Sequence, residues 1–128
     1  MTQELWIPGP LPGINELIGA AKGAGGTGAA YSRLKRQWGE TVWAYAKNAR
    51  LKRADGPVDM HFVWREKNKR RDLDNICGGG QKLILDGLVK AGVLDNDGWE
   101  HVASIEHRFQ VDPRNPGVLV YISPACPF

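Results

Sequence analysis

Two aspartates separated by a single residue, Asp72 and Asp74, have the types and spacing most suggestive of chemistry in this chain. In an extended segment, side chains two residues apart point the same way, so both carboxylates are expected on one face just before a helix begins. Two such groups repel each other unless a cation lies between them. Carboxylate oxygens favour Mg²⁺ or Mn²⁺ over zinc, and the turn at 94–98, which holds Asp95 and Asp97, could supply a third carboxylate.

Structural roles for the same residues remain open at this point. Asp74 or Asn75 could simply cap a helix, which is the commonest use of these residues at such a place. Asp97 could serve only the Asn-Asp-Gly turn in which it stands. A calcium loop is disfavoured, because the regularly spaced oxygen ligands and closing glutamate of that pattern are missing.

A cluster of basic residues stands immediately before Asp72. Five of the seven preceding positions are basic: Arg65, Lys67, Lys69, Arg70 and Arg71. The net charge of +3 is only mildly basic, but local positive potential of this kind suits a polyanion. Hydrolysis of a phosphodiester needs cations that hold the neighbouring phosphates and a carboxylate-bound metal that activates water. The segment offers both in order.

The segment from residue 69 to 99 carries several parts of a known pattern. These are Arg71, then Asp72-Leu73-Asp74-Asn75, then Lys82, then Lys90-Ala91-Gly92-Val93, and finally Asp95-Asn96-Asp97. In this order the segment, about a quarter of the chain, resembles the RusA family of Holliday junction resolvases. Lys82, Asp86 and Asp97 keep the family's relative spacing, which selects Asp97 rather than Asp95 as the third carboxylate.

The resemblance implies a function and a set of roles. Family members are homodimers that resolve four-way DNA junctions by paired nicking, in recombination and repair. Carried over, Asp72, Asp74 and Asp97 would hold Mg²⁺, which Mn²⁺ can replace, and Lys82 would assist catalysis. The Pro/Asn segment at 11–15 looks like the family's N-terminal loop. The DNA contacts implied are Lys69, Arg70, Arg71, Asn75 and Asn15.

Two departures from the family affect these expectations. Asp74 and Lys82 are eight residues apart, one helical turn more than in the best-known member, although one turn preserves the helix face. In addition, three glycines occupy positions 78–80, and each costs a helix roughly 1 kcal/mol relative to alanine. Either the helix starts late, near Gln81, or something approaches the glycines closely. We expect the segment 77–80 to lie near a dimer axis or the DNA.

The elements that must position these residues follow from hydrophobic periodicity and turn signals. The pattern predicts a single α+β domain over residues 1–128, with a mixed sheet and two main helices on one face, in RusA-like β-α-β-α-β-β order. The expected elements are a strand at 2–7, a helical turn at 14–18, a mobile Gly/Ala-rich loop at 19–30, a helix from Tyr31 to near Lys52 capped by Thr27 or Ser32, a strand at 58–65, a helix at 75–90 ended by Gly92, strands at 102–111 and 118–122, and a loose tail at 123–128.

Aromatic residues and histidines receive mostly structural assignments. Trp6, Trp38 and Trp64 stand at apolar positions of expected elements, so we expect them in the core. Trp99 stands beside Asp97 and is the better candidate for a DNA or partner contact. His61 lies in a strand pattern and is expected to be structural.

Composition limits the remaining classes. Cys77 and Cys126 match no metal or redox spacing, so we expect reduced thiols in a cytoplasmic protein. Neither a membrane-length apolar run nor a signal-peptide pattern is present.

Three functions stay open on the sequence alone: a structure-specific endonuclease, a non-catalytic module that binds branched DNA, and a structural domain with an incidental acidic turn. Metal-dependent nicking separates the first from the others, and salt-sensitive DNA binding separates the second from the third.

Overall fold

Four strands form one mixed sheet in the order β1-β4-β2-β3 in the computed structural model, which describes residues 1–22 and 28–126. The strands are β1 (Gln3–Pro8), β2 (Val58–Glu66), β3 (Val102–Val111) and β4 (Gly117–Pro124). β4 runs antiparallel to both of its neighbours, whereas β2 and β3 are parallel. Parallel neighbours need a long crossover, and here it passes through a helix.

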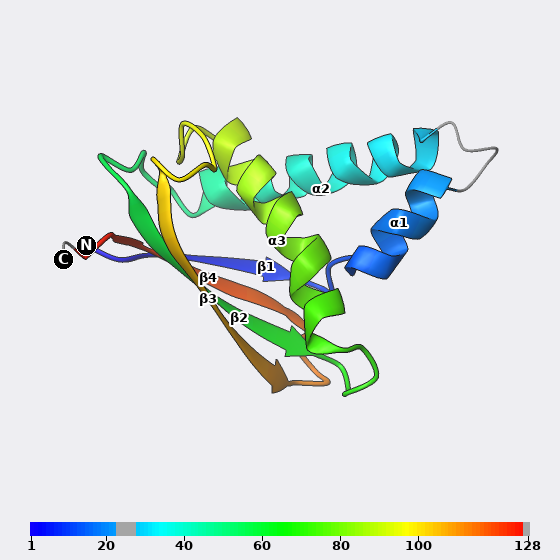
Figure 1. Cartoon of the computed structure of the whole chain (residues 1–128). Coiled ribbons are helices and arrows are strands. Elements are labelled where there is room, and N and C mark those ends of the chain that lie inside the picture. Colours follow the sequence, from blue (N-terminus) through cyan, green and yellow to red (C-terminus); the bar gives the residue numbers. More distant parts are fainter. Residues whose placement is uncertain (23–27, 127–128) are drawn as a thin grey trace.

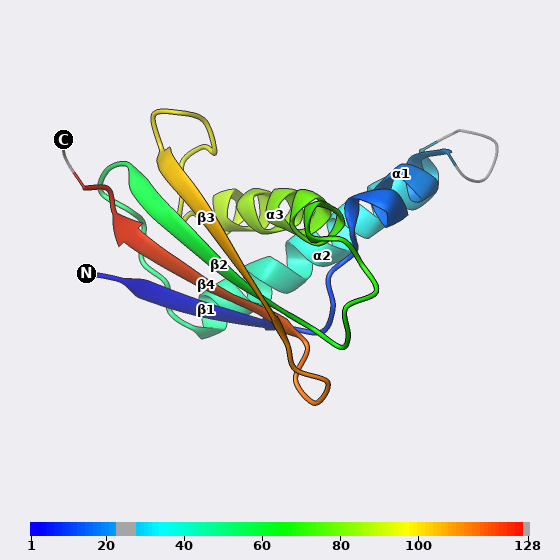
Figure 2. The same cartoon turned by 60° about the horizontal axis from the view of Figure 1, so that its bottom comes forward.

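Three helices lie on one side of this sheet (Figure 1). They are α1 (Ile14–Lys22), α2 (Ala29–Asn48) and α3 (Leu73–Lys90), and α3 provides the crossover from β2 to β3. Alternation along β2 turns Met60, Phe62 and Trp64 toward the helices, where they are fully buried. The α+β class, the mixed sheet and the helices on one face are thus confirmed (Figure 2).

The helices around the expected Gly/Ala-rich loop are longer than predicted. α1 has nine residues rather than one turn, and it buries Leu17. α2 begins at Ala29 after a left-handed Gly28, so Ser32 is not its cap, and it ends at Asn48 rather than near residue 52. The two main helices expected are present as α2 and α3, but α1 adds a third, shorter helix. The prediction of a loop over 19–30 is wrong at both ends, because alanine favours helix even where apolar side chains are few. Residues 23–27, with the alternative cap Thr27, lie outside the described residues.

The C-terminal segment is held more firmly than expected. β4 extends to Pro124, beyond the predicted end at 122. The Ala125 amide then donates to the Pro57 carbonyl, and the Cys126 amide donates to Asp59 Oδ2. The prediction of a loose tail is wrong as far as Cys126, since backbone bonds continue there, while residues 127–128 lie outside the described residues.

The glycine run lies inside α3, which is helical from Leu73 onward. A Cβ added at Gly79 would lie 2.6 Å from the Gly13 carbonyl carbon and the Pro12 oxygen, and one added at Gly80 would lie 2.6 Å from the Trp64 ring. The chain's own β1–α1 loop and β2 therefore make the close approach. The prediction of a late helix start is wrong, and the glycines need no dimer partner or DNA to explain them, because the chain itself fills the space.

Candidate functional site

The first two predicted carboxylates stand at the N-terminus of α3. Asp72 is the N-cap residue, with an extended backbone and no capping bond from its side chain. Asp74 lies in the first turn, where its Oδ1 accepts a hydrogen bond from the backbone N–H of Asn75 at 2.9 Å. Both side chains are exposed. The alternative that Asp74 or Asn75 caps the helix is wrong, because Asp72 is the N-cap. The extended geometry expected for the pair holds only for Asp72, since Asp74 is already helical.

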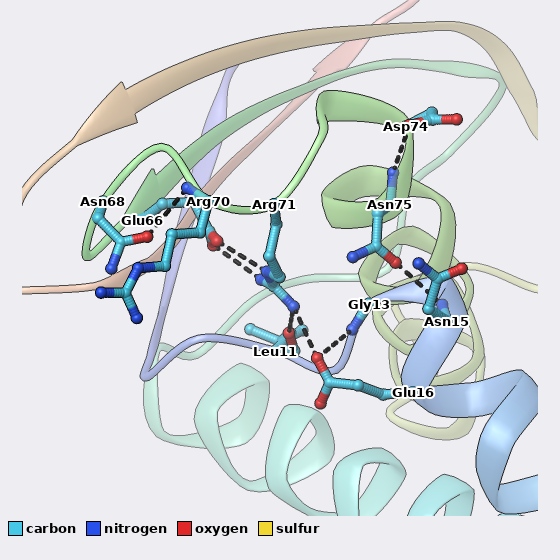
Figure 3. A network of polar contacts seen from close by, with 10 residues as sticks. All are labelled: Leu11, Gly13, Asn15, Glu16, Glu66, Asn68, Arg70, Arg71, Asp74 and Asn75. Carbon is cyan, nitrogen blue, oxygen red and sulfur yellow. Dashed lines mark hydrogen bonds and ion pairs between the residues drawn. The ribbon is translucent and has the colours of Figure 1, made fainter.

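The predicted N-terminal loop does lie against this helix start. The backbone N–H of Asn15 donates to Asn75 Oδ1 at 2.9 Å, and this bond joins α1 to α3 (Figure 3). A Cβ at Gly13 would lie 2.6 Å from the same Oδ1, so glycine is needed where the loop passes Asn75. The Asn15 side chain is exposed. The structure thus brings Asn15 and Asn75 together, and it assigns Asn75 a bracing role that the sequence did not reveal.

Arg71 is the centre of a polar clamp that sequence analysis missed (Figure 3). Its guanidinium donates two bonds of 2.8 Å to Glu66 and one bond of 3.0 Å each to the Leu11 carbonyl and to Glu16. The side chains of Arg71 and Glu66 are only 21% and 11% exposed. The hydrogen bond and charge of Glu66 raise the pKa of Arg71 further above its usual value, although burial opposes the shift.

A signal for this clamp was present in the sequence. β2 alternates buried apolar residues through Trp64, and the same period places a charged residue, Glu66, on the helix-facing side. A buried carboxylate requires a partner, and Arg71 is the nearby cation that reaches it. The predicted DNA role of Arg71 stays a prediction, since the guanidinium is already occupied by two carboxylates. Lys69 and Arg70 are exposed in the β2–α3 loop and present the free basic charge there.

The remaining predicted residues gather farther along α3. Lys82 Nζ lies 3.1 Å from Asp86 Oδ1 and 3.6 Å from Asp97 Oδ2. Lys82 and Asp86, four residues apart, thus form an ion pair on one face of α3. Asp86 also lies 3.7 Å from Lys35 of α2, a contact that spacing alone could not predict.

The environment of Lys82 keeps it charged. A hydrogen bond and the charge of Asp86, followed by the charge of Asp97, raise the pKa of Lys82 despite some burial. A lysine with a raised pKa is protonated at neutral pH, so Lys82 is suited to stabilising negative charge rather than to accepting a proton.

The two aspartates of the α3–β3 turn have different partners. Asp97 is half-buried beside Lys82, whereas Asp95 forms an ion pair with Arg53. Trp99, two residues farther on, is 97% exposed. The turn therefore presents Asp97 and the indole toward different surroundings, and Asp95 has a separate structural role.

The predicted site is divided between two places on α3. Asp74 and Lys82 are eight helical residues apart, which corresponds to about 12 Å along the axis. Within residues 1–22 and 28–126, no three His, Cys, Asp or Glu side chains are grouped closely enough to hold a metal ion. Asp72 and Asp74 stand at the start of α3, whereas Asp97 stands beside Lys82, its counter-charge. By chemistry these carboxylates suit Mg²⁺, but this geometry does not bring all three together.

His107 is a further residue whose connections were not predicted. The Trp64 indole nitrogen donates to His107 Nδ1 at 2.9 Å, and His107 Nε2 lies 2.8 Å from Gln81 Oε1. An indole N–H can only donate, so Nδ1 must be the acceptor and Nε2 must carry the proton that Gln81 receives. The ring thus ties β3 to β2 and α3. His61, expected to be structural, lies half-buried with Nδ1 3.7 Å from Glu106.

The aromatic predictions are confirmed in part. Trp64 is buried and Trp38 packs against the core, but Trp6 lies on the face of the sheet away from the helices, under the Arg65 guanidinium. Trp6 is half-exposed because it stands at the outward position of β1.

Comparison with known proteins gives no match to a family model and no similar curated protein. Among the described residues, no helix has both the length and the apolar character that a membrane crossing requires.

Proposed function

We propose that this protein is a Mg²⁺-dependent endonuclease that cuts branched DNA as a homodimer, with a fold of the RusA type. The observation that carries the proposal is the pair of exposed carboxylates, Asp72 and Asp74, at the start of α3, directly after the exposed cations Lys69 and Arg70. A carboxylate pair able to hold Mg²⁺, beside exposed cations that can hold phosphates, is the arrangement that metal-dependent hydrolysis of a phosphodiester uses.

The surroundings support this assignment. The N-terminus of α3 carries a positive partial charge, which favours a DNA phosphate close to the two carboxylates. Lys69 and Arg70 would hold neighbouring phosphates of the backbone. Lys82, which stays protonated, would offset negative charge on the reacting phosphoryl group. Asp72, Asp74 and Asp97 would hold Mg²⁺, whose chemistry is to activate water and to offset charge on the leaving oxygen.

The separation of the carboxylates favours one alternative. Asp97 pairs with Lys82 rather than with the two aspartates at the helix start, so the nuclease proposal requires Asp97 to exchange Lys82 for the metal. A protein in which that exchange never occurs would be a non-catalytic module for branched DNA, using the same basic loop. Nicking decides between the two.

The test is incubation of a synthetic four-way junction with the protein and Mg²⁺, beside a linear duplex. We expect nicking of the junction with Mg²⁺ or Mn²⁺ and binding without efficient nicking in Ca²⁺, because Ca²⁺ is larger and coordinates more loosely. Salt-sensitive binding without nicking in any of these ions would establish the non-catalytic module instead.

Substitutions locate the chemistry. Asp72→Asn, Asp74→Asn and Asp97→Asn should each lower the nicking rate by at least about a hundredfold while binding persists, because the basic loop remains. Asp95→Asn is the matched control, since Asp95 stands two residues from Asp97 but pairs with Arg53. Normal nicking by Asp97→Asn together with an inactive Asp95→Asn would overturn the ligand assignment.

A further inference from the structure

The outer edge of β3 is the longer of the two edges of the described sheet. β3 is ten residues long, it ends the sheet, and among the described residues only β2 pairs with it (Figure 2). An edge strand offers a row of backbone donors and acceptors to any further strand, and proteins usually protect such edges with lysine, proline, bulges or short length. Residues 102–111 contain neither lysine nor proline, and the one irregularity in their pairing with β2, at Ala103, lies near the start of the strand.

Both faces of β3 leave side chains available to a neighbour. On the helix-facing side, Ile105 and Val111 are 36% and 45% exposed, and Phe109 is half-buried. On the opposite side Glu106 and Arg108 are exposed. The edge therefore combines an apolar face, which gains from being covered, with a face that carries one charge of each sign.

The order of these residues is self-complementary. In an antiparallel pair, directly opposed residues share a face of the sheet. Two copies of β3 related by a two-fold axis must therefore pair even-numbered residues with even-numbered ones and odd with odd. With the axis at His107, Glu106 lies opposite Arg108 of the second copy, and Ile105 lies opposite Phe109. Symmetry makes each of these pairs occur twice.

Neighbouring registers lack this complementarity. Moving the axis to residue 106 places Glu106 opposite a second Glu106, and moving it to residue 108 places Arg108 opposite a second Arg108. Like charges directly opposed destabilise a strand pair, so both shifts are disfavoured. The charge pattern therefore favours the register with its axis at His107 over the two neighbouring registers.

We propose that a second copy of this chain docks on β3, by antiparallel pairing of the two β3 strands across a two-fold axis at His107. The two four-stranded sheets then form one continuous sheet of eight strands, with the helices of both copies on the same face. This deepens the homodimer of the proposed function, but it rests only on residues of β3 and on none that would bind metal or DNA.

The arrangement also sets the spacing of the two candidate sites. β3 begins directly after the turn that holds Asp97, and antiparallel pairing places the two turns at opposite ends of the paired strands. Ten residues at about 3.4 Å each separate them by roughly 30 Å along the strands. Both turns enter the sheet from its helix-covered side, so the two sites would share a face.

The experiment measures the molar mass of the full chain in solution by sedimentation equilibrium, from 1 to about 100 μM, without DNA or added metal. We expect a dimer for the parent. Glu106→Arg and Arg108→Glu should each weaken dimerisation at least tenfold, because each replaces two attractive pairs by two repulsive ones. The double variant E106R/R108E restores opposite charges across the axis and should recover the dimer.

Controls separate this proposal from loss of folding and from the nuclease. Thermal melts identify a single variant that merely unfolds, and Arg114→Glu, an exposed change in the β3–β4 turn, should leave the dimer intact. A parent that stays monomeric throughout the concentration range overturns the proposal. So do single variants that dimerise like the parent, or a double variant as weak as either single one. A dimeric parent without nuclease activity would refute the proposed function alone.

Discussion

The glycine face of α3 and the outer edge of β3 are both places where the chain leaves its backbone open to close approach. At Gly79 the chain fills the space itself, since the backbone at Pro12 and Gly13 would lie 2.6 Å from an added Cβ. At β3 the described residues provide only β2, on one side. The same kind of open backbone is thus an internal joint in one region and a free surface in the other.

The difference shows what local sequence can and cannot predict. Three consecutive glycines in a helix predict that something must approach closely, and this holds at two of the three. The approaching groups belong to Pro12 and Gly13 at one glycine and to Trp64 at the other. These residues are distant in the sequence, so no local pattern identifies them. An alternating strand likewise predicts a half-buried ribbon but not its place at the edge of a sheet.

The closed region, where the β1–α1 loop meets α3, should depend most strongly on the polar clamp around Arg71. Glu66→Gln should lower the free energy of unfolding by about 3 kcal/mol, because it removes the charge that compensates the largely buried Arg71 guanidinium. Glu16→Gln is the matched control: Glu16 contacts the same guanidinium, but its side chain is well exposed, so we expect a loss of less than about 0.5 kcal/mol. Urea denaturation measures both, and equal losses would show that burial of the pair does not matter.

The glycine face can be tested by two adjacent substitutions with opposite expected signs. Gly79→Ala places a methyl group against backbone that cannot rotate away, and we expect a loss of about 2 kcal/mol. Gly78→Ala meets only the Ile14 side chain at 3.5 Å, an ordinary contact, so the better helix propensity of alanine should stabilise the protein by roughly 0.5–1 kcal/mol. Stabilisation by both changes would mean that the loop and α3 are not in contact in solution.

The framework of the fold was largely predictable, and the contacts within the site were not. Alternation identified β2 and β3, and Gly92 does adopt the left-handed conformation, with φ of +78°, that ends α3. The carboxylates were expected just before a helix; Asp72 is its N-cap, but Asp74 already lies in the first turn, so the alternation of an extended segment does not apply to the pair. By contrast, the pairing of Lys82 with Asp97 and of Arg71 with Glu66 depends on how α3 returns across the sheet, and charge clusters in a sequence do not specify their partners.

The smallest expected effect concerns His107, which joins the open strand β3 to β2 and α3. His107 of β3 accepts the Trp64 indole proton at Nδ1, and a protonated ring could no longer accept it. Burial, and then the charge of His61, lower the pKa of His107 below its usual value near 6.5. The unfolded chain therefore binds the proton more readily, and stability present above pH 6.5 should be lost as the pH falls toward the lowered pKa.

Thermal melts between pH 8 and pH 5 test this coupling. The parent should lose a few degrees of melting temperature below pH 6.5, and His107→Gln, which cannot titrate, should be less stable at pH 8 but should lose less on acidification. His101→Gln is the matched control, because His101 lies outside the Trp64–Gln81 connection and should leave the pH dependence as in the parent. If His107→Gln keeps the full acid sensitivity of the parent, protonation of His107 is not the cause of that sensitivity, and β3 is joined to α3 by packing alone.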